Sequence, residues 1–184
     1  GFHNACDEPL DRFFARFIYN RNFLLESKLQ FPPLRVYEDP IFLLCTLLKA
    51  EEYYAVPDVV YRYNGTHSNK RITLACTKDY LRGLIAELKL SKKKDLPEIH
   101  TLCCDRLMRE ADFYAQRFLK TEDPELLALL LEANAAVSPQ LLKDLPEDGS
   151  VILPALRTIW HAGCRYLRWR DQRIIRTLCD VFVK

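Results

Sequence analysis

The fold of this chain is organised by one stretch, Tyr37-Glu38-Asp39-Pro40-Ile41-Phe42-Leu43-Leu44-Cys45-Thr46-Leu47-Leu48-Lys49. Pro40 suits the first position of a helix, and Asp39 suits the N-cap before it. The residues after Pro40 are apolar around nearly the whole helix, which predicts that the helix is buried. Glu38 and Asp39 therefore form a pair of carboxylates at the start of a buried helix, where the helix dipole favours negative charge.

The segment on the N-terminal side is predicted to be helical over residues 9 to 28. Pro9 suits a first helical turn, and apolar residues recur at helical spacing from Leu10 to Phe17. The run Phe31-Pro32-Pro33 ends this pattern because proline removes a hydrogen-bond donor. After the central helix, residues 53 to 63 alternate in the manner of a strand, and a polar loop follows.

From about residue 76 onward the whole chain is predicted to be helical. One helix carries its apolar face from Leu81 to Leu88, and a second runs from Ile99 toward Phe118. Asp123-Pro124 and Ser138-Pro139 start two more, and a long helix follows Pro154. The predicted fold class is mainly α, with at least six helices and one small β element between residues 53 and 63.

The composition is that of a globular protein. The chain has 184 residues, of which 49% are hydrophobic and 28% charged, so it can bury a core. No stretch of apolar residues is long enough for a transmembrane helix. No starting Met is present, and we expect the chain to be a piece of a longer protein.

The formal net charge is only +2, but residues 151–184 carry seven Lys or Arg against two Asp or Glu. Three interpretations of this basic C-terminal helix stay open: a closing helix with solvated arginines, a contact with an anionic membrane surface, and binding to nucleic acid. We rank the closing helix first and nucleic acid last, because no nucleic-acid-binding motif accompanies the charge.

The seven cysteines contain no C-x-x-C pair, and the histidines are isolated in the sequence. We therefore expect reduced thiols in a cytosolic protein, and we expect no metal site in this chain.

Two interpretations of Glu38-Asp39 follow from the residues alone. In the first, Asp39 is only an N-cap, which stabilises a helix by roughly 1 kcal/mol. In the second, the carboxylate accepts a proton from a hydroxyl, as a general base does. Spacing by itself favours the cap.

Four short motifs add a resemblance. They are Ile18-Tyr19-Asn20-Arg21-Asn22-Phe23-Leu24, Phe31-Pro32, Tyr37-Glu38-Asp39-Pro40-Ile41-Phe42 and Tyr61-Arg62-Tyr63. In this order they resemble the second half of the catalytic domain of family-two glycosyltransferases, which have a GT-A type α/β fold. The resemblance covers roughly residues 12 to 70. It implies that residues 2–75 are the C-terminal, acceptor-side part of that domain and that residues 76–184 are a helical extension.

The resemblance also implies roles for individual residues. Asp39 would be the catalytic base of an inverting transfer from a nucleotide sugar to an acceptor hydroxyl, and Glu38 would help to shape the acceptor side. His67 and Arg71, in the loop after Tyr63, would lie near the donor diphosphate as cofactor-binding residues. The biosynthetic role that the resemblance implies is surface polysaccharide or glycoconjugate synthesis, with a sugar or lipid-linked acceptor.

The sequence departs from the family pattern in two places. Many members carry a lysine where this chain has Phe17, with Arg16 one position away. No D-x-D triplet occurs, so the divalent metal, Mg or Mn, is expected only in a full-length enzyme with an upstream nucleotide-binding half. The chain alone is therefore predicted to be inactive.

An alternative function is a non-catalytic helical interaction module in which Glu38-Asp39 is only a cap. For either function we expect a cytoplasmic location, with membrane contact at the inner face through residues 157–184 as a further expectation. No nucleic acid partner is expected. A homodimer is expected if removal of the nucleotide-binding half bares an apolar face.

Overall fold

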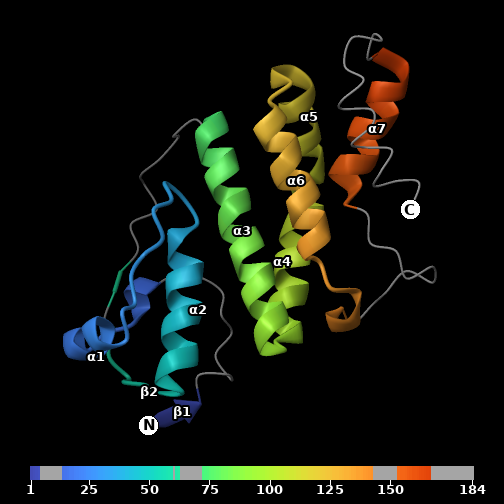
Figure 1. Cartoon of the computed structure of the whole chain (residues 1–184). Coiled ribbons are helices and arrows are strands. Elements are labelled where there is room, and N and C mark those ends of the chain that lie inside the picture. The colour runs from blue at the N-terminus through green and yellow to red at the C-terminus, as the bar shows by residue number, and fades with distance from the viewer. Residues whose placement is uncertain (5–13, 60, 63–71, 143–152, 167–184) are drawn as a thin grey trace. The chain divides into compact units, whose positions relative to one another are not determined.

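A computed structural model describes residues 1–4, 14–59, 61–62, 72–142 and 153–166 of the chain. The described residues are mainly helical, with one two-stranded sheet (Figure 1). This confirms the predicted mainly α class with a small β element. The chain divides into two compact units, Gly1–Glu87 and Leu88–Lys184, and each is described by itself.

The described residues form helices and two strands of three residues each. In chain order they are β1 (Phe2–Asn4), the 3-10 helix η2 (Phe14–Arg16), α1 (Arg21–Glu26), α2 (Glu38–Ala50), β2 (Glu52–Tyr54), α3 (Leu74–Lys94), α4 (Pro97–Arg109), α5 (Ala111–Thr121), α6 (Pro124–Ala136), the 3-10 helix η3 (Pro139–Leu141) and α7 (Pro154–Tyr166).

The sheet is smaller than the predicted strand over residues 53 to 63. β2 pairs antiparallel with β1, with Phe2 opposite Tyr54 and Asn4 opposite Glu52. Gly1 and Ala55 exchange two further backbone hydrogen bonds of 2.8 Å just beyond β2, which ends at Tyr54. Pro57 follows three residues later and cannot donate to a sheet ladder, which limits the strand.

Helix α2 begins two residues earlier than predicted. Its N-cap is Tyr37 and not Asp39, and Asp39 lies inside the first turn. Pro40 is compatible with this start because the first amides of a helix have no intrahelical acceptor. The prediction of a buried helix is confirmed, since Phe42, Leu43, Leu44 and Leu47 are all buried.

The predicted helix over residues 9 to 28 is wrong in its described part. The chain forms η2, then leaves helical geometry, and re-enters a helix at α1. Asn20 is the reason, because its backbone is extended and its side-chain oxygen accepts hydrogen bonds from the amides of Asn22 (2.9 Å) and Phe23 (3.3 Å). This is an N-cap arrangement, so a new helix starts within the motif Ile18–Leu24.

Helix α3 has the predicted apolar stripe. Leu81, Leu84, Ile85 and Leu88 are all buried. The spacing of three and four residues places them on one helical face.

The second unit is built from α4, α5, α6, η3 and α7. The predicted helix from Ile99 toward Phe118 is two helices, because the backbone leaves α-helical angles at Glu110. The predicted start at Asp123-Pro124 is confirmed, since the Asp123 carboxylate accepts a hydrogen bond from the amide of Leu126 at 2.8 Å. The short helix after Ser138 is the 3-10 helix η3.

The C-terminal helix is described only as far as Tyr166. In that part α7 packs against α5 and α6, and Leu156 and Ile159 are completely buried. The rest of the predicted basic helix lies outside the described residues. Within the described residues, no helix combines the length and apolar character that crossing a bilayer requires.

Candidate functional site

The structure places Glu38 and Asp39 together in the first turn of α2, and both side chains are half-buried. The unsatisfied amides of this turn give the site a partial positive charge, which stabilises carboxylates. Sequence reasoning therefore located the pair correctly at a helix start, although the cap itself is Tyr37.

Tyr37 holds an unusual backbone conformation. Its φ is 65° and its ψ is 23°, in the left-handed region that bulky residues rarely adopt. Such a conformation costs about 1–3 kcal/mol and persists only where the surroundings hold it. Residues of α3 provide part of these surroundings.

The contacts of Tyr37 with α3 are specific. Its hydroxyl donates a hydrogen bond to Oε2 of Glu87 at 2.7 Å, and Glu87 is 1% exposed. Its ring centroid lies 4.6 Å from that of Tyr80. Its Cδ1 atom would lie 2.6 Å from a Cβ atom added at Gly83. Glycine is therefore required at position 83 by the close approach of the tyrosine.

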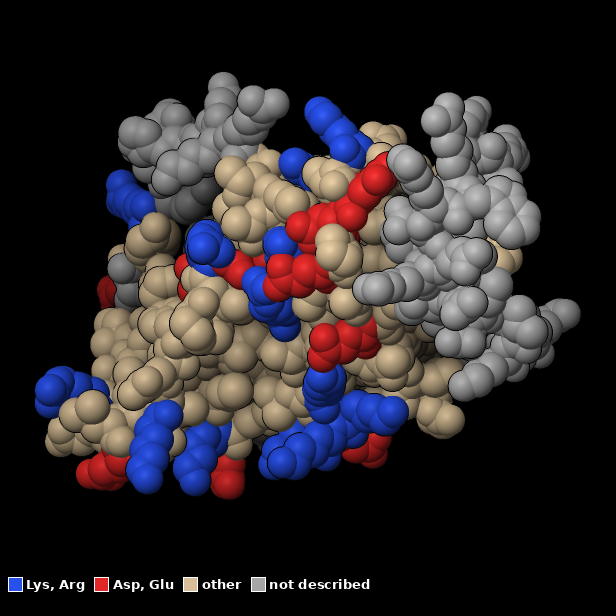
Figure 2. All heavy atoms as spheres, turned by 45° about the horizontal axis from the view of Figure 1, so that its top comes forward, with Lys and Arg blue, Asp and Glu red and all other residues tan. Residues whose placement is uncertain are grey.

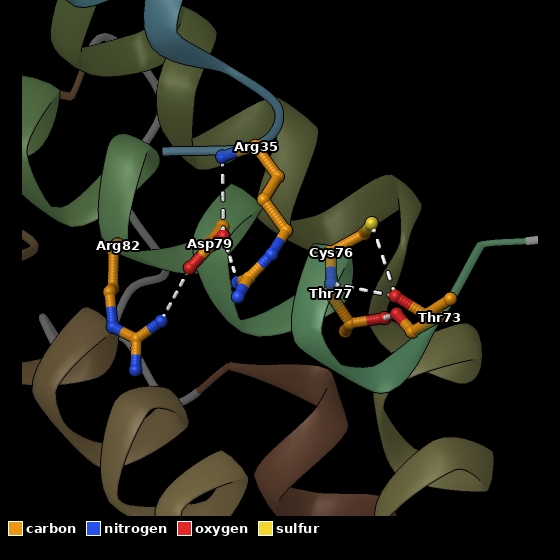
Figure 3. Close-up of polar contacts among 6 residues, drawn as sticks. All are labelled: Arg35, Thr73, Cys76, Thr77, Asp79 and Arg82. Carbon is orange, nitrogen blue, oxygen red and sulfur yellow. Dashed lines mark hydrogen bonds and ion pairs between the residues drawn. The ribbon is translucent and has the colours of Figure 1, made fainter. Parts of the chain in front are cut away.

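Two residues before Tyr37, the chain is fastened to α3 by charge. Asp79 accepts hydrogen bonds from the Arg35 backbone amide at 3.2 Å and from the Arg35 guanidinium at 2.7 Å. Its other oxygen accepts from the guanidinium of Arg82 at 2.6 Å. Figure 3 shows Asp79 between the two arginines. A nearly buried carboxylate is thus matched by two cationic partners.

The electrostatics agree with this arrangement. Burial by itself raises the pKa of Asp79, but hydrogen bonds from the backbone and side chain of Arg35 and from Arg82 outweigh it and lower the pKa below the ordinary value.

On α2, burial raises the pKa of the Cys45 thiol, and the negative charge of Glu87 adds to that effect. Cys45 is therefore a neutral thiol and not a nucleophile at neutral pH.

Sequence reasoning did not identify the α3 residues. Asp79, Gly83 and Glu87 are spaced four residues apart, so they share one stripe of the helix. The available signal was a pair of acids beside the apolar face of Leu81, Leu84 and Leu88, because a buried charge requires a partner.

The other predicted site residues are not brought into this arrangement. His67, Arg71 and Tyr63 lie outside the described residues. Tyr61 and Arg62 are described as exposed and belong to no strand. The contribution of this loop to a donor site stays a prediction.

A cavity of about 590 Å³ lies in the first unit, between the segment Phe17–Phe23 and the segment Leu47–Asp58. Aromatic side chains contribute much of its wall, including Phe17, Tyr19 and Tyr53. Neither Glu38 nor Asp39 lines it. The cavity and the carboxylate pair are therefore separate features of this unit.

The described residues were searched for side chains that could hold a metal ion together. No group of three or more His, Cys, Asp or Glu side chains there could hold a metal ion. Cys103 and Cys104 are buried and form no disulfide, and burial, with a contribution from Asp105, raises the pKa of Cys104 to about 12. The divalent metal that the resemblance implies was expected in an upstream nucleotide-binding half, and that expectation stays a prediction.

Charged side chains of both signs lie on the face drawn in Figure 2. Acidic and basic side chains lie next to each other on that face (Figure 2). Lys89 and Glu132 form an ion pair in the second unit, with Nζ and Oε1 2.6 Å apart.

The chain was compared with protein-family models, with curated proteins and with solved structures, and none of the three comparisons finds a match.

Proposed function

We propose that this chain is the acceptor-side part of an inverting glycosyltransferase, with Asp39 as its catalytic base and Glu38 beside it on the acceptor side. The observation that carries the proposal is the placement of Tyr37-Glu38-Asp39 in the first turn of α2, fastened to α3 through Asp79 and Glu87. A structural cap does not need this amount of fastening, whereas a general base needs a fixed position.

The proposed step is a single displacement. Asp39 accepts the proton of an acceptor hydroxyl while that oxygen forms a bond to the anomeric carbon of the donor sugar. The bond from the anomeric carbon to the phosphate oxygen breaks, and the nucleotide leaves with the electron pair from the opposite face. The configuration at the anomeric carbon is therefore inverted.

A second observation supports the view that the first unit is part of a larger domain. It exposes many large apolar side chains, among them Phe2 (76% exposed), Ile18 (85%) and Val59 (73%). Apolar residues in such number are usually covered by another layer of structure. We propose that this layer is the nucleotide-binding half, which would also supply the donor site and the divalent metal.

The decisive experiment is Asp39→Asn in a full-length protein that contains this chain. The change is nearly isosteric but removes the base, so transfer should fall by about 10²–10⁴-fold while the circular dichroism spectrum is unchanged. The matched control is Glu26→Gln, which removes an exposed charge on α1 and should keep full activity.

Full activity of Asp39→Asn would overturn the assigned role. It would leave the non-catalytic helical module as the better interpretation of the chain.

A further inference from the structure

The start of α2 is held in a conformation that its own sequence does not favour. Tyr37 is left-handed, yet it is neither glycine nor asparagine, the residues that adopt this region most readily. Glu38 and Asp39 follow it directly, so the backbone angles of Tyr37 determine where the first turn of α2 is placed. If the φ and ψ angles of Tyr37 varied, the positions of both carboxylates would vary with them.

The side chain of Tyr37 makes contacts that stabilise its unfavourable backbone conformation. The phenol donates to Glu87, which is buried, and the ring lies against Gly83 and Tyr80. The phenol hydroxyl and the ring therefore fix the tyrosine at both ends of its side chain. A hydrogen bond to a buried carboxylate is strong and is expensive to leave unmade.

We propose that Tyr37 and Glu87 are positioning residues for Asp39. The hydrogen bond between them holds the left-handed turn and thereby the first turn of α2. This assignment rests on the proposed function only for its catalytic consequence, because the ordering of the first turn can be measured in the chain alone.

The first test is amide hydrogen exchange by NMR on the 184-residue chain. The amides of Phe42 and Leu43 close early hydrogen bonds of α2. In Tyr37→Phe they should exchange about tenfold faster than in the wild type, while amides near the C-terminal end of α2 keep their rates. Glu87→Gln retains an acceptor for the phenol and should stay near wild type.

The matched control is Tyr54→Phe, which removes the hydroxyl of an exposed tyrosine in the same unit. It should leave both exchange rates unchanged. If Tyr37→Phe unfolds because Glu87 loses this hydrogen bond, the double variant Tyr37→Phe with Glu87→Leu removes that charge and should show the same local opening. Unchanged rates at Phe42 and Leu43, or an equal rise throughout α2, would overturn the positioning role.

The second test uses the full-length transferase. Tyr37→Phe should lower kcat by about tenfold with the donor KM nearly unchanged, because only the placement of the base is altered. Glu87→Gln should retain most of kcat. A rise in KM with unchanged kcat would contradict the assignment.

The two tests separate the two proposals. If Asp39→Asn leaves transfer intact, the proposed function fails, and the exchange experiment still decides whether Tyr37 orders the turn. If exchange is unaffected by Tyr37→Phe, the positioning role fails, whatever the activity of Asp39→Asn.

Discussion

His100 is completely buried, and both of its ring nitrogens have partners. Nε2 accepts a hydrogen bond from the Ser138 amide at 2.8 Å, so the ring proton must be on Nδ1. Nδ1 then donates to Oγ of Ser91 at 2.9 Å, and that hydroxyl donates to the Leu88 carbonyl. The neutral imidazole is thus required by its neighbours, and its role is structural.

The stability of the second unit should therefore depend on pH. Burial lowers the pKa of His100 below 6.5; the Leu88 carbonyl opposes this and the charge of Lys92 adds to it. Because the unfolded chain binds the proton more readily, the stabilising contribution is complete above the unfolded pKa and is lost as pH falls below 6.5 toward the lower folded value. For this one proton the free energy of unfolding should fall by at most about 1.4 kcal/mol per pH unit.

Urea unfolding between about pH 7.5 and 5 checks this dependence. His100→Gln should remove the part of the slope that belongs to His100, whereas the exposed His161→Gln should leave it in place. Equal slopes in the wild type and His100→Gln would contradict the prediction.

At the scale of single elements, α3 carries an unusual glycine. Replacing glycine by alanine in a helix interior normally stabilises by roughly 0.5–1 kcal/mol. At Gly83 the new Cβ would lie 2.6 Å from Cδ1 and 3.0 Å from the carbonyl oxygen of Tyr37. Gly83→Ala should therefore destabilise the chain by about 1–3 kcal/mol, as overpacking does.

The measurement is again urea unfolding. Ala86→Gly is the matched control, since Ala86 is exposed on the same helix and should show the ordinary loss of about 1 kcal/mol. A stabilised Gly83→Ala variant would show that the close approach of Tyr37 is not constraining.

The elements also show what periodicity can predict. The α3 stripe and the Asp123 cap were predictable, because each is encoded within one or two turns of sequence. The breaks before α1 and at Glu110 were not, because no glycine or proline marks them. At the first break the Asn20 cap overrides an apolar pattern that continues on both sides of it.

At the scale of the whole molecule, the candidate site was only half predictable. Glu38 and Asp39 could be found because they are adjacent in the sequence and precede an apolar run. Their supporting residues, Asp79 and Glu87, are distant in the sequence and meet the site only through the fold of the first unit. Contacts between residues so far apart in the sequence leave no local sequence pattern, except that Asp79 and Glu87 are charged residues beside the apolar face of α3.

The chain alone should not bind a nucleotide sugar tightly. The groups that would stabilise a diphosphate are proposed to lie in the nucleotide-binding half. Isothermal titration of the 184-residue chain with uridine and guanosine diphosphate sugars should give no heat of binding at micromolar concentrations. Micromolar affinity for either nucleotide would place a donor site in this chain.

Peripheral membrane contact through residues 157–184 stays a prediction. The described part of α7 buries Leu156 and Ile159, so these two residues are not available for such a contact, and the prediction rests on the rest of the segment with its basic residues. Each could contribute on the order of 1 kcal/mol at an anionic surface, an effect that salt weakens. Anionic vesicles should therefore co-sediment the protein at low salt, and removal of residues 165–184 should release it.

Neutral vesicles are the control in that experiment. Equal retention on neutral and anionic vesicles, or no retention on either, would leave α7 as a closing helix.

The close approach of Tyr37 to Gly83 has a consequence for the divergence of this sequence. The closest contact that a Cβ at position 83 would make is with the ring of Tyr37, so a smaller residue at 37 relieves that contact, although the carbonyl oxygen of residue 37 still lies 3.0 Å away. The two positions should therefore covary in homologues. Covariation between positions 37 and 83 in homologues would show that the close packing of these two residues constrains the sequence.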